Sequence, residues 1–321
     1  IYVTFFQLFI CWDDEAQCWS RNLTSAVESL IKAKDINAII ATGHPFQVNY
    51  LASQVRKKQP NIALLQDFRD PWVPSWSVKL SRKRYQKFKK MRTEACAQAD
   101  LIVTVTESLC AFYRQFLPEC KKDNRVKLIP NGYDQKIIKS VLQKRGYISN
   151  KKAPKKKLEM VHVGNITNGR DESLFSFLRT VQYVKNQFSL DLKLVFAGFI
   201  PRRALNFINK MHTAIDFEYC GDVPYTKALQ LAADADFCLH FGSRRAVDAR
   251  STKIYEYAAL ERPVISFNYG GELHRLIDIH SLGYSFDISG GDVSSDELNH
   301  ILRTKRQFSY DVEEFAYENL S

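Results

Sequence analysis

Residues able to bind a phosphorylated ligand stand close together in the stretch STKIYEYAALERPVISF, at positions 251–267. The pattern predicts a helix that begins at Ser251, and the first N–H groups of a helix have no partner within it, so they favour an anion. Glu256 lies more than one turn into this helix, where its carboxylate would accept two hydrogen bonds from a ribose diol. Charge-assisted bonds of this kind contribute about 1.5–3 kcal/mol each. The structural alternative is an ion pair with Lys253 on a surface helix.

A second stretch with the same chemistry is VHVGNITNGRDE, at positions 161–172. Gly164 would let the backbone approach a bound ligand because it has no Cβ. Arg170 would form a bidentate fork with a diphosphate. The structural alternative is that Arg170 pairs with Asp171 or Glu172 in a surface loop.

The first half of the chain carries a cluster of charged residues in LLQDFRDPW, at positions 64–72. Asp67, Arg69 and Asp70 follow the end of an expected strand and face an expected cleft between two domains, and His44 follows the previous strand. A carboxylate in such a place would bind a substrate hydroxyl or steer its proton. A structural ion cluster, in which Arg69 holds both aspartates, remains an equal alternative.

These side chains need a framework of parallel strands to position them, and the sequence predicts one. Short apolar runs rich in β-branched residues alternate with longer amphipathic runs, which indicates parallel sheets with helical crossovers. We therefore expect an α/β protein with two Rossmann-like, doubly wound parallel-sheet domains. The expected strands lie near 36–42, 61–68, 101–106 and 125–130, and then near 158–164, 192–199, 215–221, 237–242, 263–268 and 283–288.

The expected domain boundaries follow from this alternation. The first domain would span 1–150 and the second 151–308, with a lysine-rich linker, KKAPKKK, at 151–157. We expect residues 309–321 to form a helix that returns toward the first domain. No glycine-rich turn follows an opening strand, so we expect the first domain to lack its opening βαβ unit and strand 36–42 to have incomplete neighbours.

Composition narrows the class of protein. The 321 residues are 45% hydrophobic, which is typical of a folded globular chain. Seven scattered cysteines without CxxC spacing favour neither a disulfide framework nor a zinc site, and they suit a reducing, cytoplasmic compartment. The opening ten residues are apolar, which is the length of a buried strand and too short for a membrane span.

The formal net charge of +11 indicates an anionic partner, and one basic stretch concentrates that charge. Residues 79–92, KLSRKRYQKFKKMR, contain eight basic residues and no acidic one. Tyr85, Phe88 and Met91 fall on one face of the expected helix. This helix would either lie on an anionic membrane surface or pack its apolar stripe on the sheet.

The motifs at 161–172 and 251–267 resemble the donor site of family-four retaining glycosyltransferases, which have the two-domain GT-B fold. That family has two acidic residues separated by seven others; here Asp248 and Glu256 have this separation, with aspartate where the family usually has glutamate. The stretch 220–241 is similar to the family's segment that passes the nucleotide base, and we interpret its His240 as an ordinary core or edge histidine. LLQDFRDPW resembles a bacterial subset of the family.

The resemblance implies transfer of a sugar from a nucleotide diphospho-sugar to an acceptor hydroxyl, with retention of configuration, in polysaccharide or glycolipid synthesis. It implies neither a metal nor a cofactor, and an acceptor saccharide, free or lipid-linked, as the second substrate. The implied catalytic residues are Arg170, Lys253 and Asp248. The implied donor-binding residues are Gly164, Asn165, Val223, Ser251, Thr252 and Glu256, and the acceptor-side residues are His44, Asp67, Arg69 and Asp70.

Three alternatives remain open at this point. A truncated or degenerate GT-B protein would bind nucleotide without turnover. A nucleic-acid-binding protein would explain the charge, although only 79–92 combines aromatic and basic residues. A non-hydrolysing nucleotide-sugar epimerase shares the fold, but its motifs are not found in the sequence.

Overall fold

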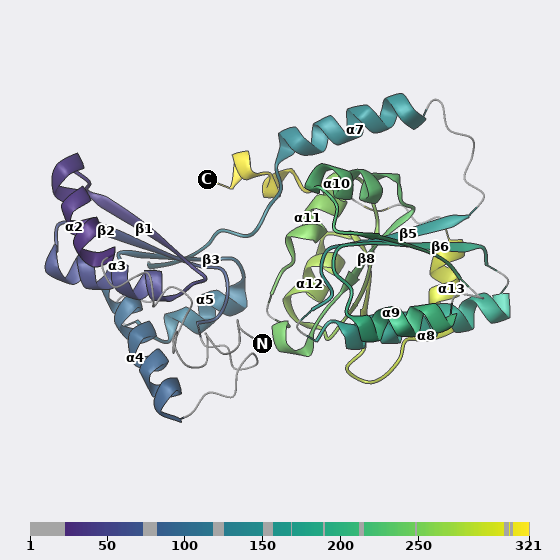
Figure 1. Cartoon of the computed structure of the whole chain (residues 1–321), viewed down its shortest axis with the longest axis horizontal. Helices are drawn as coiled ribbons and strands as arrows, with labels where there is room; N and C mark the ends of the chain where they lie inside the picture. Colours follow the sequence, from purple (N-terminus) through teal and green to yellow (C-terminus); the bar gives the residue numbers. More distant parts are fainter. Residues whose placement is uncertain are drawn as a thin grey trace. The chain divides into compact units, whose positions relative to one another are not determined.

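The computed structural model describes residues 23–72, 82–117, 125–149, 157–167, 169–188, 190–211, 215–247, 249–304, 308 and 311–320. The chain divides into two compact units, unit 1 (Ile1–Pro130) and unit 2 (Asn131–Ser321) (Figure 1). Each unit has its own parallel sheet, with helices packed on it. The expectation of two parallel-sheet α/β domains is therefore confirmed.

Unit 1 contains a four-stranded sheet in the order β1-β2-β3-β4, and every described pair of neighbours is parallel. Its strands are β1 (Ala38–Gly43), β2 (Ala63–Phe68), β3 (Leu101–Thr104) and β4 (Val126–Leu128). Its described helices are α2 (Leu23–Lys34), α3 (Gln47–Lys58), α4 (Arg82–Gln98) and α5 (Glu107–Arg114). The centre of its core is aromatic: the rings of Phe68 and Tyr113 stack with centroids 4.3 Å apart.

The expected small first sheet is confirmed for the described part of the chain. β1 lies at the edge of the sheet, and the Ile40 side chain on it is 71% exposed. Helix α2 was not expected; it forms because Val27 and Ile31, four residues apart, pack together against Val55 and its neighbours. The strand expected over the opening ten residues lies outside the described residues.

Unit 2 contains a six-stranded sheet in the order β10-β9-β8-β5-β6-β7, again with parallel neighbours. This is the order of a complete doubly wound domain, and the chain changes direction across the sheet between β5 and β8. The strands are β5 (Leu158–Val163), β6 (Leu192–Ala197), β7 (Asp216–Gly221), β8 (Phe237–Phe241), β9 (Val264–Asn268) and β10 (Gly283–Asp287). The helices are α7 (Gln135–Ser149), α8 (Asp171–Phe188), α9 (Arg202–Met211), α10 (Tyr225–Asp234), α11 (Thr252–Ala259), α12 (Gly271–Ile279) and α13 (Ser295–Arg303).

Alternation along the central strand fills both faces of this sheet. Phe237, Leu239 and Phe241 of β8 belong to the core beneath α8, whereas Cys238 belongs to the core beneath α10 and α11. His240 also faces the second core, because successive side chains of a strand point to opposite faces. A polar ring is thus placed inside an otherwise apolar layer.

The boundary between the units differs from the expected one near residue 150. It falls after Pro130, because helix α7 packs on α10 and α11 and so belongs to unit 2. Ile138 and Val141 supply the apolar face that α7 buries there. Residues 135–149 were expected to belong to the first domain, and they form a helix of the second core instead.

The end of the chain does not form the expected helix. Two short 3₁₀ turns, η5 (Glu313–Phe315) and η6 (Tyr317–Asn319), are separated by Ala316 with extended backbone. That extended residue lets the backbone pair with Tyr133, whose N–H donates to Phe315 O at 3.1 Å and whose O accepts from Tyr317 N at 3.0 Å. The Phe315 ring packs against Tyr255 of α11 and against His280 at the end of α12, so the described contacts of this segment lie within unit 2.

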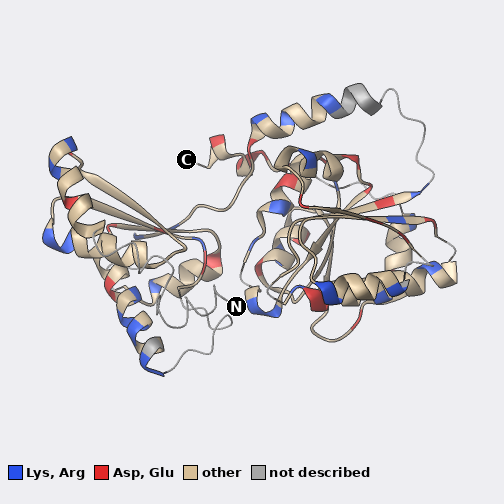
Figure 2. Cartoon of the chain, in the orientation of Figure 1, with Lys and Arg blue, Asp and Glu red and all other residues tan. Residues whose placement is uncertain are grey.

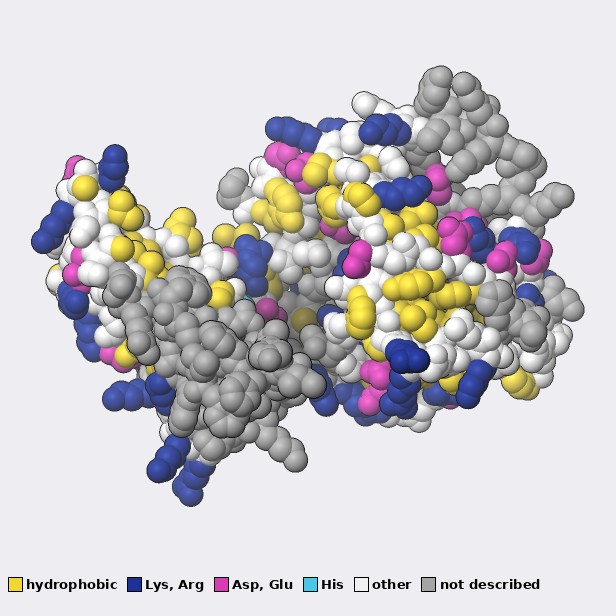
Figure 3. Space-filling view, in the orientation of Figure 1, with side chains coloured by type: hydrophobic (Ala, Val, Ile, Leu, Met, Phe, Trp, Pro, Cys, Tyr) yellow, Lys and Arg dark blue, Asp and Glu magenta, His cyan; other side chains and the backbone are white. Residues whose placement is uncertain are grey.

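Helix α4 contains most of the basic stretch 79–92, which was expected either to lie on a membrane surface or to pack on the sheet. Phe88 and Met91 are buried in the core of unit 1, so most of the apolar stripe packs on the sheet, as the structural alternative proposed. Tyr85 remains 43% exposed beside the basic side chains. Figures 2 and 3 show basic residues gathered around the end of unit 1 where α4 begins. No helix among the described residues is long and apolar enough to cross a bilayer.

Candidate functional site

The candidate donor site lies where β5 and β8 end, at the carboxyl edge of the sheet of unit 2. The crevice beside such a change of direction is where doubly wound sheets bind ligands, because helix N-termini and loops meet there. Gly164 follows β5 and Arg170 precedes α8, whereas Lys253 lies in the first turn of α11. The order of the strands therefore brings together residues almost 90 positions apart.

Position 164 must be a glycine because the Lys253 side chain passes directly beside its backbone. Its φ is +119°, and a Cβ at this position would lie 2.8 Å from Lys253 Nζ and closer still to the carbon beside it. Gly198 has a φ of +109°, and a Cβ at this position would lie 2.7 Å from the Gly164 carbonyl. Gly164 thus leaves the space in which the Lys253 side chain lies, and Gly198 allows the loop after β6 to approach the Gly164 backbone.

Lys253 and Arg170 form an unneutralised pair of cations. Burial lowers the pKa of Lys253, the charge of Arg170 lowers it further, and Glu256 partly opposes the shift. Burial also lowers the pKa of Arg170. Neither side chain has an ion-pair partner among the described residues. Half-buried like charges without a counter-ion are unfavourable, so this position favours a doubly charged anion such as a diphosphate.

In the described part of the chain, Arg170 does not form the ion pair with Asp171 or Glu172 that was its structural alternative. Glu172 accepts a hydrogen bond from Tyr269 Oη at 3.0 Å and pairs with Arg244 at 3.5 Å. Asp171 makes no ion pair with Arg170 within 4 Å. Arg170 therefore makes no ion pair with either of its acidic sequence neighbours.

Glu256 is held by a residue that the sequence analysis did not identify. Tyr225 Oη donates to Glu256 Oε1 at 2.7 Å, and burial together with this carboxylate raises the tyrosine pKa. No ion pair joins Glu256 to Lys253 within 4 Å among the described residues. No hydrogen bond to the second carboxylate oxygen, Oε2, is found in the described part of the chain. The signal for Tyr225 was its place directly after the Val223-Pro224 turn.

The remaining donor-side candidates are placed less directly. Ser251 precedes α11 and makes no side-chain cap, so the first N–H groups of the helix, near Thr252, are not capped by it. Asn165 Oδ1 accepts from Phe199 N at 2.8 Å, which ties the loop after β5 to the loop after β6. Val223 lies in the turn before α10. Asp248 lies outside the described residues.

Two buried histidines lie beside the cations. Burial lowers the pKa of His162 to about 4, and its Nδ1 contacts Leu239 O at 3.0 Å. Burial lowers the pKa of His240 well below its usual value, and the charges of Lys253, His162 and Arg170 act in the same direction. Both rings are therefore neutral near pH 7. The interpretation of His240 as an ordinary buried histidine agrees with its burial but leaves out the nearby cations.

The acceptor-side candidates lie in unit 1, after β1 and β2. Arg69 Nε pairs with Asp67 Oδ2 at 3.0 Å, and Asp67 is 7% exposed. Asp70 has no ion pair among the described residues. Partial burial raises the pKa of the Asp70 carboxyl, and the nearby His44 opposes the shift. The structure thus brings His44 near Asp70, and the alternative of Arg69 holding both aspartates is observed for Asp67.

The loop that carries Asp70 is anchored by two residues that the sequence analysis missed. Tyr113 Oη donates to Asp70 O and accepts from Trp72 N, both at 2.9 Å. Arg92, 4% exposed, donates to Trp72 O at 3.0 Å and lies over the Phe116 ring at 3.9 Å. These contacts fix the backbone of the loop, and they do not involve the carboxylate of Asp70.

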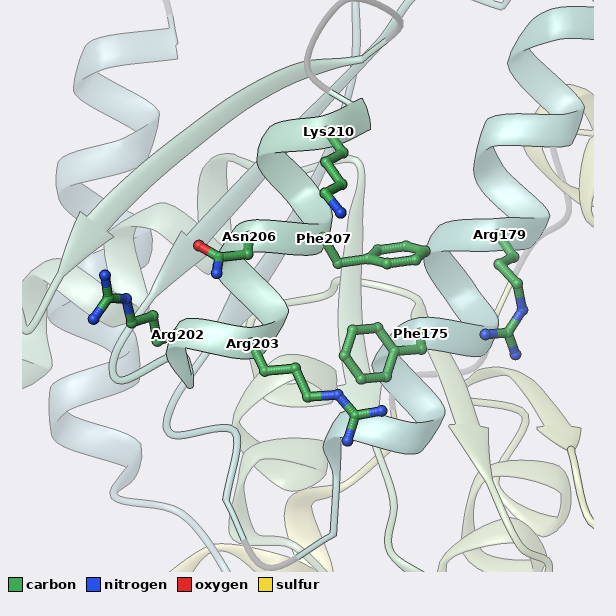
Figure 4. Close-up of a pocket in the computed structure, with 7 residues that line it drawn as sticks. All are labelled: Phe175, Arg179, Arg202, Arg203, Asn206, Phe207 and Lys210. Atoms are coloured by element: carbon green, nitrogen blue, oxygen red, sulfur yellow. The ribbon is translucent and has the colours of Figure 1, made fainter.

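A different hollow lies between α8 and α9, with a volume of about 580 Å³ (Figure 4). Its lining combines two phenylalanine rings with four cations: Phe175, Phe207, Arg179, Arg202, Arg203 and Lys210, together with Asn206. None of the donor-side candidates lines it. In the described part of the chain, no group of three or more His, Cys, Asp and Glu side chains is placed to hold a metal ion.

Comparison with known proteins identifies the fold. No family model matches the sequence, and no curated protein matches it significantly. The trehalose-6-phosphate phosphatase N-terminal domain of Candida albicans is 15% identical, with 96% of this chain and 73% of that chain covered and a TM-score of 0.64. The UDP-forming α,α-trehalose-phosphate synthase of Burkholderia xenovorans is 11% identical, with 89% and 68% covered and a TM-score of 0.58.

An epimerase has a similar fold. The UDP-GlcNAc 2-epimerase of Methanocaldococcus jannaschii is 12% identical, with 92% of this chain and 78% of that chain covered and a TM-score of 0.55. At these identities the likeness establishes the fold alone: two α/β domains of GT-B type, an architecture shared with glycosyltransferases that use nucleotide sugars.

The burial of His162 predicts a pH dependence of stability. As pH falls from 7 to 5, the unfolded imidazole, with a pKa near 6.5, takes up a proton, whereas the buried ring, with a pKa of about 4, does not. Proton uptake stabilises the unfolded state relative to the folded state. His162 alone should therefore lower the free energy of unfolding by about 2 kcal/mol between pH 7 and pH 5, and His240 should lower it further. Urea unfolding at both pH values measures this.

The variant His162→Asn keeps an N–H donor for Leu239 O but cannot titrate, so it should lose about 2 kcal/mol less than the wild type between pH 7 and 5. The matched control is His300→Asn on exposed α13, which should behave as the wild type does. Equal pH sensitivity in His162→Asn and the wild type would contradict the assignment.

Proposed function

We propose that the chain is a glycosyltransferase that moves a sugar from a nucleotide diphospho-sugar to an acceptor hydroxyl. The observation that carries the proposal is the pair Lys253 and Arg170, two half-buried cations with no anionic partner among the described residues. They stand at the change of direction of a doubly wound sheet, where such folds bind nucleotides. The GT-B fold supports the same assignment, because enzymes with this fold use nucleotide sugars.

Each donor-side residue has a role in this proposal. Lys253, Arg170 and the first N–H groups of α11 stabilise the negative charge that develops on the departing diphosphate, usually the largest single contribution to catalysis. Glu256, oriented by Tyr225, binds the ribose diol, and the backbone at Val223 holds the base. The resemblance to family-four enzymes supports retention of configuration and an acceptor from polysaccharide or glycolipid synthesis.

On the acceptor side, Asp70 is the residue best suited to take a proton from the attacking hydroxyl. Its carboxylate has no ion pair among the described residues, and partial burial raises its pKa, which makes it a stronger base than an exposed aspartate. Asp67, held by Arg69, orients the acceptor by hydrogen bonding. His44 supplies a second polar contact beside Asp70.

An epimerase is the second candidate, favoured by the likeness to the archaeal UDP-GlcNAc 2-epimerase. An epimerase converts a UDP-sugar without an acceptor, whereas a transferase needs an acceptor. NMR of UDP-GlcNAc incubated with the protein and no acceptor would show a second UDP-sugar isomer if the chain were an epimerase. A transferase would leave the donor intact until an acceptor is added. A chain that binds nucleotide but turns over no donor–acceptor pair would be a degenerate GT-B protein.

A peripheral position on an anionic membrane is the second part of the proposal. Lys83, Lys89 and Lys90 on α4 are exposed, whereas Phe88 and Met91 are buried, so the contact would be electrostatic rather than inserted. Each basic residue near an anionic lipid surface contributes about 1 kcal/mol. Such a position on the inner face of the cytoplasmic membrane would suit a lipid-linked acceptor.

The Glu256 assignment gives the first prediction. A panel of UDP-, GDP- and ADP-sugars should contain at least one donor that raises the melting temperature, since a ligand bound only by the folded state stabilises it. Glu256→Ala should then bind that donor roughly 10- to 100-fold more weakly, because two charge-assisted hydrogen bonds are lost. Calorimetric titration measures the affinity. Glu297→Ala on exposed α13 is the control, and equal donor affinity in Glu256→Ala and the wild type would rule out the ribose role.

The membrane assignment gives the second prediction. Replacing Lys83, Lys89 and Lys90 by glutamine should reduce partitioning onto phosphatidylserine-containing vesicles by about 100-fold or more, because three contributions of about 1 kcal/mol are lost. Sedimentation with vesicles measures this, and neutral phosphatidylcholine vesicles and a triple glutamine variant at Arg202, Arg203 and Lys210 on α9 serve as controls. Unchanged binding of the α4 variant would contradict the assignment.

A further inference from the structure

A buried chain of polar side chains runs beneath the donor site, between the sheet and helices α11 and α12. Asn268 at the end of β9 is 3% exposed, and its Nδ2 contacts two hydroxyl oxygens, Ser266 Oγ and Ser285 Oγ, each at 2.8 Å. Its Oδ1 accepts from Gly270 N at 2.9 Å. Because a backbone N–H can only donate, the amide oxygen must face Gly270 and the NH₂ group must face both serines.

Each serine then has its own proton left for one further partner. Ser266 Oγ lies 3.1 Å from His240 Nδ1, and Ser285 Oγ lies 2.8 Å from His274 Nδ1. A serine hydroxyl oxygen can accept two hydrogen bonds, so the bond from Asn268 does not by itself fix the direction toward the histidine. No acceptor for the Ser266 proton other than His240 Nδ1 is found among the described residues, so we assign the Ser266 hydroxyl as the donor and His240 Nδ1 as the acceptor. Ser285 and His274 Nδ1 are assigned in the same way.

This arrangement determines where the proton of each neutral imidazole lies. A neutral ring with Nδ1 accepting carries its hydrogen on Nε2. His274 agrees, since its Nε2 lies 3.2 Å from Asp278 Oδ2, which can only accept when ionised. His240 must likewise present an Nε2–H, but this group has no partner in the described part of the chain.

The surroundings of His240 Nε2 belong to the donor site. The side chain is 6% exposed, and Lys253 and Arg170 are near enough for their charges to lower its pKa. The ring consequently stays neutral, and it lies near the two cations that the proposed anion would contact. His240 lies one residue before the end of β8, so the strand itself holds it at the edge of the crevice.

We propose that His240 is a specificity-determining donor contact: its Nε2–H, oriented by the Asn268–Ser266 chain, donates a hydrogen bond to a phosphate oxygen of the nucleotide diphospho-sugar between Lys253 and Arg170. The inference rests on the proposed function. It adds a directional contact to two cations, which attract an anion without fixing its orientation. No bond is made or broken at His240, and it positions the diphosphate.

The tautomer is tested first, on the free protein. Two-dimensional ¹H–¹⁵N spectra of protein labelled on its histidine ring nitrogens distinguish the tautomers, and His240→Asn assigns the signal by its loss. The expected result at pH 7 is an unprotonated Nδ1 and a protonated Nε2. A protonated Nδ1 would overturn the inference and leave the proposed function intact.

Affinity is tested next, by calorimetry with UDP, GDP and ADP. Asparagine at 240 can still accept from Ser266 but falls short of the crevice, whereas glutamine can place an N–H near the position of Nε2. His240→Asn should therefore bind the preferred nucleoside diphosphate about tenfold more weakly, and His240→Gln should lose less than His240→Asn does. The His240 Nε2–H signal should shift on addition of that nucleotide.

The matched control is His274→Asn, which disturbs the other end of the same buried chain away from the cations. It should change affinity less than threefold, and an equal loss in both asparagine variants would show that the chain is merely structural and would overturn the inference. Equal affinity of His240→Asn and the wild type would overturn it too, with the proposed function unaffected. If the wild type binds none of the three nucleotides, the proposed function fails and the inference fails with it.

Discussion

The central constraint on unit 2 is that two half-buried cations, Lys253 and Arg170, lie near each other with no ion-pair partner among the described residues. Lys253 and Arg170 repel each other, and burial disfavours the charge of each, so the pKa of both is lowered. A fold that only needed stability would place an acid beside them or replace them with apolar side chains. Their place beside a crevice of the nucleotide-binding type is the basis of the proposal that an anionic ligand completes the site.

The strand order of unit 2 and two glycines, Gly164 and Gly198, allow the two cations to lie near each other. The order of the strands brings the end of β5 beside the end of β8, and the loops after them carry the two cations toward each other. Gly164 leaves room for the Lys253 side chain, and Gly198 leaves room for the Gly164 backbone. Beneath, Asn268, Ser266 and Ser285 supply hydrogen bonds in the core, so His240 can be buried beside two positive charges without being charged itself.

Strands, helices and the main donor-side residues could be predicted because they depend on local patterns. Apolar periodicity indicated all ten strands near their observed places, and Gly164, Arg170 and Glu256 lie where helix starts and strand ends place them. Tertiary contacts decided the rest. Helix α7 joined unit 2 through Ile138 and Val141, and pairing with Tyr133 broke the expected final helix. Tyr225, Arg92 and Tyr113 were missed because their partners lie far away in the sequence.

The central claim is that Lys253 and Arg170 bind a diphosphate and are not part of a structural network. The variant Lys253→Met tests this claim most directly. The methionine side chain fills similar space without charge. The account predicts that this variant has a free energy of unfolding higher than the wild type by about 1 kcal/mol without ligand, since an unpaired charge is removed. It also predicts that the variant loses affinity for the nucleoside diphosphate that the wild type binds. A less stable variant that keeps its nucleotide affinity would contradict the account.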